Sequence, residues 1–300
     1  MATTEPPTRG LPALAGDLSP EDPSWPPGLA DLDDAVPRLR VAGRLPFLDR
    51  AVAIVGTRRA TPDGLGLARE VSRSLAGHGW VIVSGGAEGI DAAAHEGALE
   101  GGWATVAVLA GGLGRPFPRQ HAPLFERIAA GGAVLSEVDD DEAPQPHRFL
   151  SRNRIIAALS RAVLVVQAPA RSGALSTAAH ARRLGRPVFA VPWAVGDLHG
   201  AGGNSLLAAR TAWACRGADD LVQALTGGRL SVVAPARRAR PRLDPDARAV
   251  FACVDARGVH PDAIAHQTGL PASKVKAALT TLTLLGLIAP DLLGRHHRTR

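Results

Sequence analysis

Four short segments of the chain carry residue types that bind phosphate groups. The first is Gly56, Thr57 and Arg58, directly after the apolar run at residues 51–55. A glycine lets the backbone approach a ligand, a threonine hydroxyl donates a hydrogen bond, and the planar guanidinium of arginine pairs with phosphate oxygens. An ordinary strand-to-helix turn with an exposed arginine is the competing interpretation of so short a segment.

The second segment, residues 84–91, places Ser84, Gly85, Gly86 and Gly89 directly before a helical pattern. Backbone N–H groups at the start of a helix attract anions, and the helix dipole adds to this effect. A P-loop is excluded because neither lysine of the sequence follows a glycine. Ordinary NAD binding is disfavoured, because the glycine spacing does not fit the dinucleotide pattern G-x-G-x-x-G.

The third and fourth segments complete the predicted site. Residues 152–154 (Arg-Asn-Arg) open an apolar helix, and residues 172–177 open another with Ser-Gly. A solvated helix start is the alternative interpretation of the first of these. The predicted phosphate-binding residues are Gly56, Thr57, Arg58, Ser84, Gly85, Gly86, Gly89, Arg152, Asn153, Arg154, Ser172, Gly173 and Thr177.

Acidic and histidine side chains in the sequence favour structural roles over catalysis or metal binding. Asp91 stands at a helix start, where it compensates the helix dipole or anchors the backbone, and His95 is interpreted as a partly buried polar group. The acidic block at residues 139–142 is interpreted as a solvated loop. His296 and His297 belong to a basic wing or a disordered end. We therefore predict no catalytic residue, no metal site and no cofactor.

The elements that must position these segments alternate between short β-branched runs and helical patterns. Strands are predicted at residues 51–55, 80–84, 105–109, 133–136, 163–167 and 188–191, and helices at 64–78, 89–100, 122–130, 153–160 and 174–184. Apolar strands separated by helices indicate a parallel sheet covered on both faces, so the predicted fold class is α/β with a Rossmann-like doubly wound sheet. Ligands of such sheets bind at the carboxyl ends of the strands, where the four segments converge.

Composition divides the chain further. Of the 300 residues 46% are hydrophobic, which is enough to build a sizeable core. Residues 1–35 are rich in proline, glycine and aspartate and are expected to be a poorly ordered lead-in to a Rossmann-like domain at 36–225. The rest is predicted to contain a basic linker at 226–242 and a small winged-helix-like domain at 243–300, with helices at 245–255, 261–267 and 272–285 and a wing near 294–298.

The net charge of +6 is concentrated near the C-terminus. Residues 229–300 hold 12 basic and 5 acidic residues, whereas residues 51–228 hold 17 and 15. A positive surplus suggests a polyanionic partner, but affinity in the nearly neutral domain must come from placing a few arginines on one edge. Cys215 and Cys253 fit neither a disulfide scaffold nor a zinc motif. No apolar run approaches the roughly 18 residues of a membrane span and no signal peptide is recognisable, so a cytoplasmic location is expected.

These segments, in this order and spacing, resemble the DprA/Smf family, the DNA-processing protein A family. The resemblance covers about residues 36–225 and rests on residues 52–58, 84–95, 152–160 and 172–178, with support from 107–113, 185–192 and 203–207. It implies a non-enzymatic cytoplasmic homodimer that binds single-stranded DNA, protects incoming DNA in natural transformation and loads the RecA recombinase onto it. It further implies that Gly56, Thr57 and Arg58 hold DNA phosphates and that the Arg-Asn-Arg segment lies in the same pocket.

The chain departs from the family pattern at three positions. Gly86 stands where leucine is usual, Gln167 where glutamate is usual, and Trp193 where glycine is usual. The helical N-terminal domain of many members is missing or reduced to the lead-in. Gln167 and Trp193 leave the predicted phosphate-binding segments intact.

Aromatic residues near the predicted edge are few, and Phe149 is the best candidate for stacking on a base. Two other functions remain open. One is a phosphoribohydrolase-like enzyme acting on nucleotides, although its Pro-Gly-Gly loop is absent. The other is a transcription regulator that reads duplex DNA through the winged helix. The C-terminal domain binds either DNA or protein, and its charge favours DNA.

Overall fold

A nine-stranded sheet organises the described residues of the larger of two compact units, Met1–Leu230 and Ser231–Arg300. The computed structural model describes residues 11, 16–226, 243–255, 258–285, 287–291 and 294–298. The strand order is β1-β2-β6-β5-β4-β3-β7-β8-β9. In this spatial order, the last seven strands, which begin with β6 and end with β9, are parallel to one another. The strands are β1 (Gly16–Leu18), β2 (Leu39–Gly43), β3 (Ala51–Val55), β4 (Val81–Ser84), β5 (Thr105–Leu109), β6 (Ala133–Ser136), β7 (Ala162–Val165), β8 (Val188–Ala190) and β9 (Trp213–Ala214).

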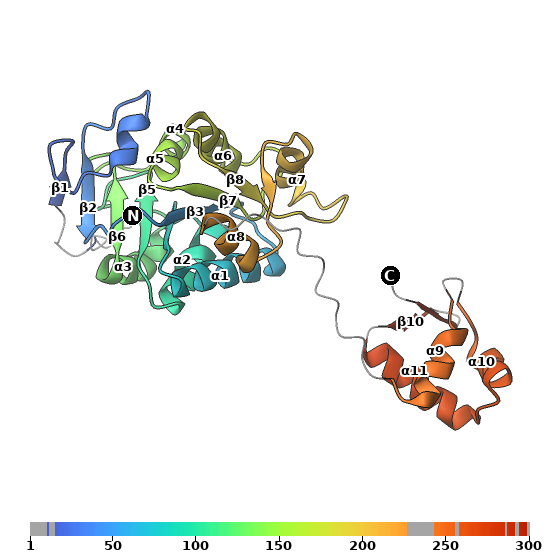
Figure 1. Ribbon diagram of the computed structural model, residues 1–300. Helices are drawn as coiled ribbons and strands as arrows, with labels where there is room; N and C mark the ends of the chain where they lie inside the picture. The colour runs from blue at the N-terminus through green and yellow to red at the C-terminus, as the bar shows by residue number, and fades with distance from the viewer. Residues whose placement is uncertain are drawn as a thin grey trace, which may run out of the picture. The chain divides into compact units, whose positions relative to one another are not determined.

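Helices cover both faces of this sheet (Figure 1). Side chains alternate across a strand, so β3 contributes to two cores. Val52 and Ile54 pack with α1 (Pro62–Gly77) and α2 (Ile90–Glu100), whereas Ala53 packs with α5 (Asn153–Ala158) and α6 (Ala174–Arg183). Because both faces are buried, the strands read as continuous apolar runs, and the predicted α/β fold class is confirmed.

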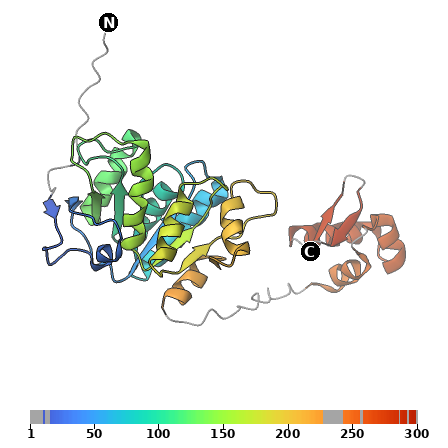
Figure 2. The same ribbon diagram turned by 90° about the horizontal axis from the view of Figure 1, so that it is seen from above.

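The strand order reverses at β3. From β3 the chain adds β4, β5 and β6 on one side, and then returns to add β7, β8 and β9 on the other. Seen from above, the sheet extends from the blue N-terminal strands to the yellow and orange segments after β7 (Figure 2). The loops after β3 and β7 therefore run to opposite faces of the sheet, and this divergence opens a crevice at their carboxyl ends.

The predicted strands correspond to β3–β8 and the predicted helices to α1, α2, α3 (Ala122–Gly131), α5 and α6. The elements that sequence analysis missed are short or partly polar. They are β1, β2, β9, the 3-10 helices η1 (Pro27–Asp31) and η2 (Arg119–His121), and the helices α4 (Pro146–Ser151), α7 (Ala201–Ala208) and α8 (Ala218–Leu225).

The N-terminal region is more ordered than predicted. Within residues 16–35, β1 pairs antiparallel with β2, and η1 contacts α5 and buries Leu29. The prediction of a poorly ordered lead-in is therefore wrong for this stretch, because a short strand and a single buried leucine leave no periodic pattern to detect. The rest of the predicted lead-in lies outside the described residues, apart from Leu11, whose amide donates to the carbonyl of Leu113.

The acidic block at residues 139–142 is held by ion pairs and is not simply solvated. Asp139 pairs with Arg38 and Asp140 with Arg40, while Glu142 lies 2.8 Å from Arg148. Two of these arginines come from β2 or the residue just before it, which sequence analysis did not recognise as a strand. The loop after β6 is thereby attached both to β2 and to α4.

The smaller unit contains three helices followed by an antiparallel pair of strands, the arrangement of a winged helix. Val250, Ile264 and Leu282 belong to its separate core. The elements are α9 (Pro245–Cys253), α10 (Pro261–Thr268), α11 (Ala272–Leu284), β10 (Ile288–Pro290) and β11 (His296–Arg298). The wing is therefore confirmed, whereas the predicted linker falls almost entirely on residues 227–242, outside the described residues.

Among the residues that the structure describes, no helix has the length and hydropathy to cross a membrane. Within the same residues, no group of three or more histidine, cysteine, aspartate or glutamate side chains is placed to hold a metal ion. Cys215 and Cys253 are both free. Burial raises the pKa of the Cys215 thiol to about 11, so this side chain is an apolar core group at neutral pH.

Candidate nucleic-acid interface

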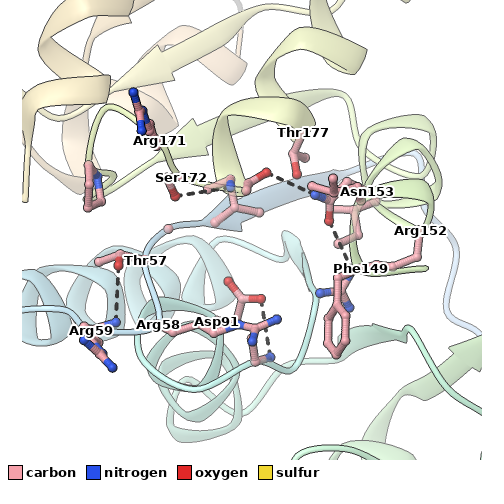
Figure 3. A pocket seen from close by; sticks show the side chains of 18 of the residues that line it. Thr57, Arg58, Arg59, Asp91, Phe149, Arg152, Asn153, Arg171, Ser172 and Thr177 are labelled. Atoms are coloured by element: carbon pink, nitrogen blue, oxygen red, sulfur yellow. Dashed lines mark hydrogen bonds between the residues drawn. The ribbon is translucent and has the colours of Figure 1, made fainter. Parts of the chain in front are cut away.

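A cavity of about 600 Å³ lies at the carboxyl ends of β3 and β7, where the strand order reverses. We call it the crevice. The loops after β3 and β7 line it together with the start of α2 and with α4 and α5 (Figure 3). The predicted residues that line it are Gly56, Thr57, Arg58, Phe149, Arg152, Asn153, Ser172, Gly173 and Thr177.

Arg58 is exposed and reaches toward Phe149 (Figure 3). Its guanidinium carbon lies 4.6 Å from the centre of the Phe149 ring, a cation–π geometry. Phe149 in turn meets the ring of Phe117 edge-on, with the ring centres 5.9 Å apart. The arginine predicted to hold phosphate and the aromatic predicted to stack on a base are therefore neighbours.

Two arginines of the crevice were not among the predicted phosphate-binding residues. Arg59 and Arg171 line it and are exposed, and both stand in the loops after β3 and β7 that carry the predicted residues. In the described part of the chain, neither these two arginines nor Arg58 forms an ion pair with a carboxylate. One carboxylate, that of Asp91, lines the crevice beside them. The sequence contained a signal for both arginines, because Arg59 stands close to Thr57 and Arg171 stands next to Ser172 in the predicted segments.

The backbone at Gly56 and Thr57 is packed against the end of β7. A Cβ atom at position 56 would lie 2.8 Å from the carbonyl oxygen of Gln167, so only glycine fits there. The amide of Thr57 donates to the same oxygen at 2.7 Å, and the Thr57 hydroxyl oxygen accepts from the Arg59 amide at 3.2 Å. The hydroxyl hydrogen of Thr57 remains available to a ligand, and the two bonds together attach the arginine-bearing loop to the end of β7.

Arg152 contributes a buried positive charge. Its guanidinium donates to the carbonyl of Gly85 at 2.5 Å, to the carbonyl of Val108, and to the side-chain oxygen of Asn153 at 3.1 Å. Burial, with a smaller effect of the Arg58 charge, lowers the pKa of Arg152 to about 10, against the opposing effect of Asp91. The group therefore stays charged at neutral pH, and its Nη1 and Nε atoms donate to protein acceptors.

Asp91 lies beside Arg152 in the first turn of α2 and is buried. Burial raises its pKa, and the Arg152 charge acts in the opposite direction. Its carboxylate accepts from the Ala87 amide at 3.4 Å, the backbone-anchoring role that its position at a helix start predicts. Asp91 thus balances part of the buried charge of Arg152 and leaves the exposed arginines to set the potential of the crevice.

Asn153 connects two walls of the crevice. Its amide nitrogen donates to the carbonyl of Gly173 at 3.1 Å and to the hydroxyl of Ser176 at 2.9 Å. Ser172 starts α6 by accepting the Ala174 amide at 3.3 Å. Asn153 therefore fixes the start of α6 against α5, and both its side-chain groups are occupied by protein partners.

Five predicted residues lie outside the crevice. Arg154 donates to both carboxylate oxygens of Glu137, at 3.0 and 2.5 Å, and is buried. The Ser84 hydroxyl donates to the Ile54 carbonyl at 2.6 Å inside the sheet. The glycines Gly85, Gly86 and Gly89 shape the turn between β4 and α2, where Gly86 and Gly89 adopt φ of +67° and +78°.

The side chains at positions 167 and 193 support the crevice from behind. The side-chain oxygen of Gln167 accepts from the Thr61 amide at 2.9 Å, and Thr61 in turn caps α1. The Trp193 indole donates to the Val166 carbonyl at 2.7 Å. Both bonds hold the segment after β7 in place.

His95 in α2 is fully buried, not partly buried as predicted, and should make stability depend on pH. Burial, with smaller contributions from His121 and Arg152, lowers its pKa to about 3, so only the unfolded chain binds a proton near pH 6.5. The contribution of His95 to the free energy of unfolding is therefore fully present above pH 6.5. It decreases as the pH falls, by about 2 kcal/mol between pH 7.5 and pH 5.

Urea unfolding followed by tryptophan fluorescence measures this loss, because all five tryptophans lie in the larger unit. We expect His95→Gln to flatten the slope between pH 5 and pH 6.5. The control is His78→Gln, at an exposed position, which should keep the slope. Identical slopes for the wild type and His95→Gln would show that this histidine does not produce the pH dependence.

Comparison with known families gives a match to each unit. The profile of the family described as DNA recombination-mediator protein A matches residues 18–226. The profile of the DprA winged helix domain matches residues 234–291. The matched ranges contain all of the crevice and most of the smaller unit.

Curated relatives match along most of the chain. A putative DNA processing protein DprA from Mycobacterium tuberculosis is 39% identical over 287 residues, 90% of this chain and 74% of that protein. Protein Smf from Synechocystis is 36% identical over 316 residues, 94% of this chain and 79% of that protein.

Solved structures show the same fold. DprA from Streptococcus pneumoniae is 36% identical, with a TM-score of 0.66 and coverage of 70% of this chain and 74% of that one. DprA from Helicobacter pylori, whose structure is described in terms of its single-stranded DNA binding mode, is 32% identical. Its TM-score is 0.66, with coverage of 72% of this chain and 98% of that one.

Proposed function

Because the chain belongs to the DprA/Smf family of DNA-processing proteins, we propose that it binds single-stranded DNA in the crevice. The observation that carries this proposal is the set of exposed arginines Arg58, Arg59 and Arg171 around a cavity at the carboxyl ends of β3 and β7. None of these three arginines forms an ion pair with a carboxylate in the part of the chain that the structure describes. The single-stranded DNA binding described for the Helicobacter pylori relative supports the same class of ligand.

The phosphates are the groups that these arginines recognise. A guanidinium donates two parallel hydrogen bonds to phosphate oxygens, and the Thr57 hydroxyl adds a donor beside Arg58. Arg152 contributes a buried positive charge, and its Nη1 atom donates to two backbone carbonyls. Binding is therefore independent of sequence, because groups that contact phosphate and sugar do not distinguish base edges.

Phe149 supplies the apolar part of the interface. Arg58 covers one face of its ring, so a base stacks on the opposite face or on the guanidinium plane itself. Stacking on an aromatic ring contributes roughly 1–3 kcal/mol per base and tolerates every base. The Arg58–Phe149 pair thus places a phosphate-binding group and a stacking surface within one nucleotide of each other.

The biological role that we propose follows the family. The protein coats and protects incoming single-stranded DNA and loads RecA onto it, acting as a homodimer in the cytoplasm and without catalysis. The match to a recombination-mediator family and the DNA-processing relatives support this role. Asp91, which lines the crevice, is bound to a backbone amide and balanced by Arg152, which favours binding over hydrolysis.

The test is binding of fluorescein-labelled oligonucleotides by the full chain, followed by anisotropy. We expect similar affinities for mixed-sequence single strands and oligothymidylate, weaker binding of the matching duplex, and a linear loss of log affinity with log salt. Preference for one duplex sequence would instead indicate a transcription regulator. Release of free base from AMP would indicate the phosphoribohydrolase-like alternative.

A further inference from the structure

A second cavity of about 390 Å³ shares Arg58 and Arg59 with the crevice. We call it the α1–α2 groove, because most of the other residues that line it belong to α1, including Gly66 and Arg69, or to α2, including Ala93 and Glu96. Gly89, which was predicted to bind phosphate, also lines it just before α2. Since two arginines belong to both linings, a chain that leaves the crevice past Arg58 enters this groove directly.

The walls of the groove are firmly held. α1 and α2 pack closely, and Gly97 of α2 lies directly against the backbone of Arg69. At the groove entrance, the Ile90 amide donates to the Thr57 carbonyl at 3.2 Å, which ties the start of α2 to the loop after β3. The groove is therefore a preformed surface, and its entrance moves together with the arginines of the crevice.

The charges differ between the two ends of the groove. Arg59 is exposed at the entrance and has no ion pair with a described carboxylate. At the far end, Arg69 lies 2.7 Å from both Glu96 and Glu100. A phosphate at the far end would face two carboxylates, whereas the polar edge of a base can pair with donors and acceptors together.

We propose that the bound single strand continues from the crevice into the α1–α2 groove, with a phosphate between Arg58 and Arg59 and the next nucleoside against Arg69 and Glu96. This inference rests on the proposed function and adds a second nucleotide subsite to it. The groove extends the contact of one chain with DNA past the crevice without any additional domain.

Gly66 gives a direct test of this path. It is exposed on α1, and a Cβ atom added there would meet nothing within 4 Å, so larger residues fit without disturbing the fold. Gly77 on the same helix is also exposed and also has open space, but it does not line the groove. Gly66→Glu and Gly77→Glu therefore make the same charge change on one helix, inside and outside the proposed path.

The experiment measures anisotropy of the full-length variants with oligothymidylates of about 4 and about 16 nucleotides, the range that one binding module covers. Gly66→Glu should weaken binding of the long oligonucleotide roughly three- to tenfold at low salt and leave the short one nearly unchanged. Gly66→Arg should tighten the long one and steepen its salt slope by about 0.7, the value for one added phosphate contact. Gly77→Glu should change neither.

Equal effects of Gly66→Glu and Gly77→Glu would overturn the groove subsite, as would equal effects on short and long oligonucleotides. If the wild type binds and Arg58→Ala weakens binding while the Gly66 variants have no effect, the groove alone is wrong and the crevice stands. If the wild type binds no single-stranded DNA, both proposals fail. Thermal unfolding followed by tryptophan fluorescence verifies that each variant is folded.

Discussion

Replacing Arg58 with alanine is expected to weaken binding of single-stranded DNA about tenfold or more. Arg58 is exposed, lines both the crevice and the α1–α2 groove, and forms no ion pair with a described carboxylate. A hydrogen bond to a charged group contributes roughly 1.5–3 kcal/mol, and 1.4 kcal/mol is a tenfold change in affinity. The salt slope should also decrease by about 0.7 for each phosphate contact that is lost. Anisotropy at several salt concentrations measures both quantities.

Two control variants separate phosphate contact from net charge and from stacking. Arg73→Ala removes the same charge from an exposed position on α1 that lines neither cavity, and it should change affinity little. Phe149→Leu removes the aromatic ring beside Arg58 and should weaken binding with little change in salt slope. Arg58→Ala that binds as tightly as the wild type at all salt concentrations would show that the crevice is not the phosphate site.

Replacing Glu137 with alanine is expected to destabilise the larger unit by roughly 2–3 kcal/mol. Glu137 accepts two hydrogen bonds from the buried guanidinium of Arg154, and truncation leaves that charge without a partner. For a unit of this size the loss lowers the midpoint of thermal unfolding by roughly 4–12 °C. Tryptophan fluorescence reports on this unit, because it contains all five tryptophans.

Variants of the Glu137–Arg154 ion pair test whether Arg154 has a structural role or contacts DNA. Glu137→Leu combined with Arg154→Met removes both charges together and should recover much of the stability that either single change loses. At a temperature where it is folded, Arg154→Met should bind single-stranded DNA like the wild type. A folded Arg154→Met variant of unchanged stability and much weaker binding would return Arg154 to the phosphate-binding residues.

Most of the α/β unit follows from local pattern. β3 to β8 are largely apolar runs of three to five residues, buried on both faces, and most of the helices between them (α1, α2, α3, α5 and α6) could be predicted from helical spacing. The elements that sequence analysis missed lack this signal. β1 and β2 lie at the edge of the sheet and pair antiparallel, and β9 has two exposed residues at the other edge, so their positions depend on neighbours distant in sequence.

The residues of the candidate site also fall into two groups, those that local sequence pattern indicates and those that it does not. Gly56, Thr57 and Arg58 could be predicted because a strand that ends in a glycine turn exposes its next side chains at the ligand-binding edge. Arg59 and Arg171 were missed although they occupy the same loops, because the motifs stop one residue short of them. Arg154 was predicted to bind phosphate, but its ion pair joins residues 17 positions apart and leaves no trace in local pattern.

The sequence by itself determined the kind of fold, the edge of the sheet that carries the candidate site, and the residue types there that suit phosphate. Those properties depend on residue type and on spacing along a strand or helix. Only the tertiary structure decided which arginines are free to meet a ligand. Arg152 and Arg154 flank one asparagine at a helix start, yet Arg152 is buried and donates to two backbone carbonyls, and Arg154 is paired with Glu137. Arg58, Arg59 and Arg171, in contrast, stay exposed. Burial and pairing depend on what packs against a side chain, and that is decided by elements distant in the sequence.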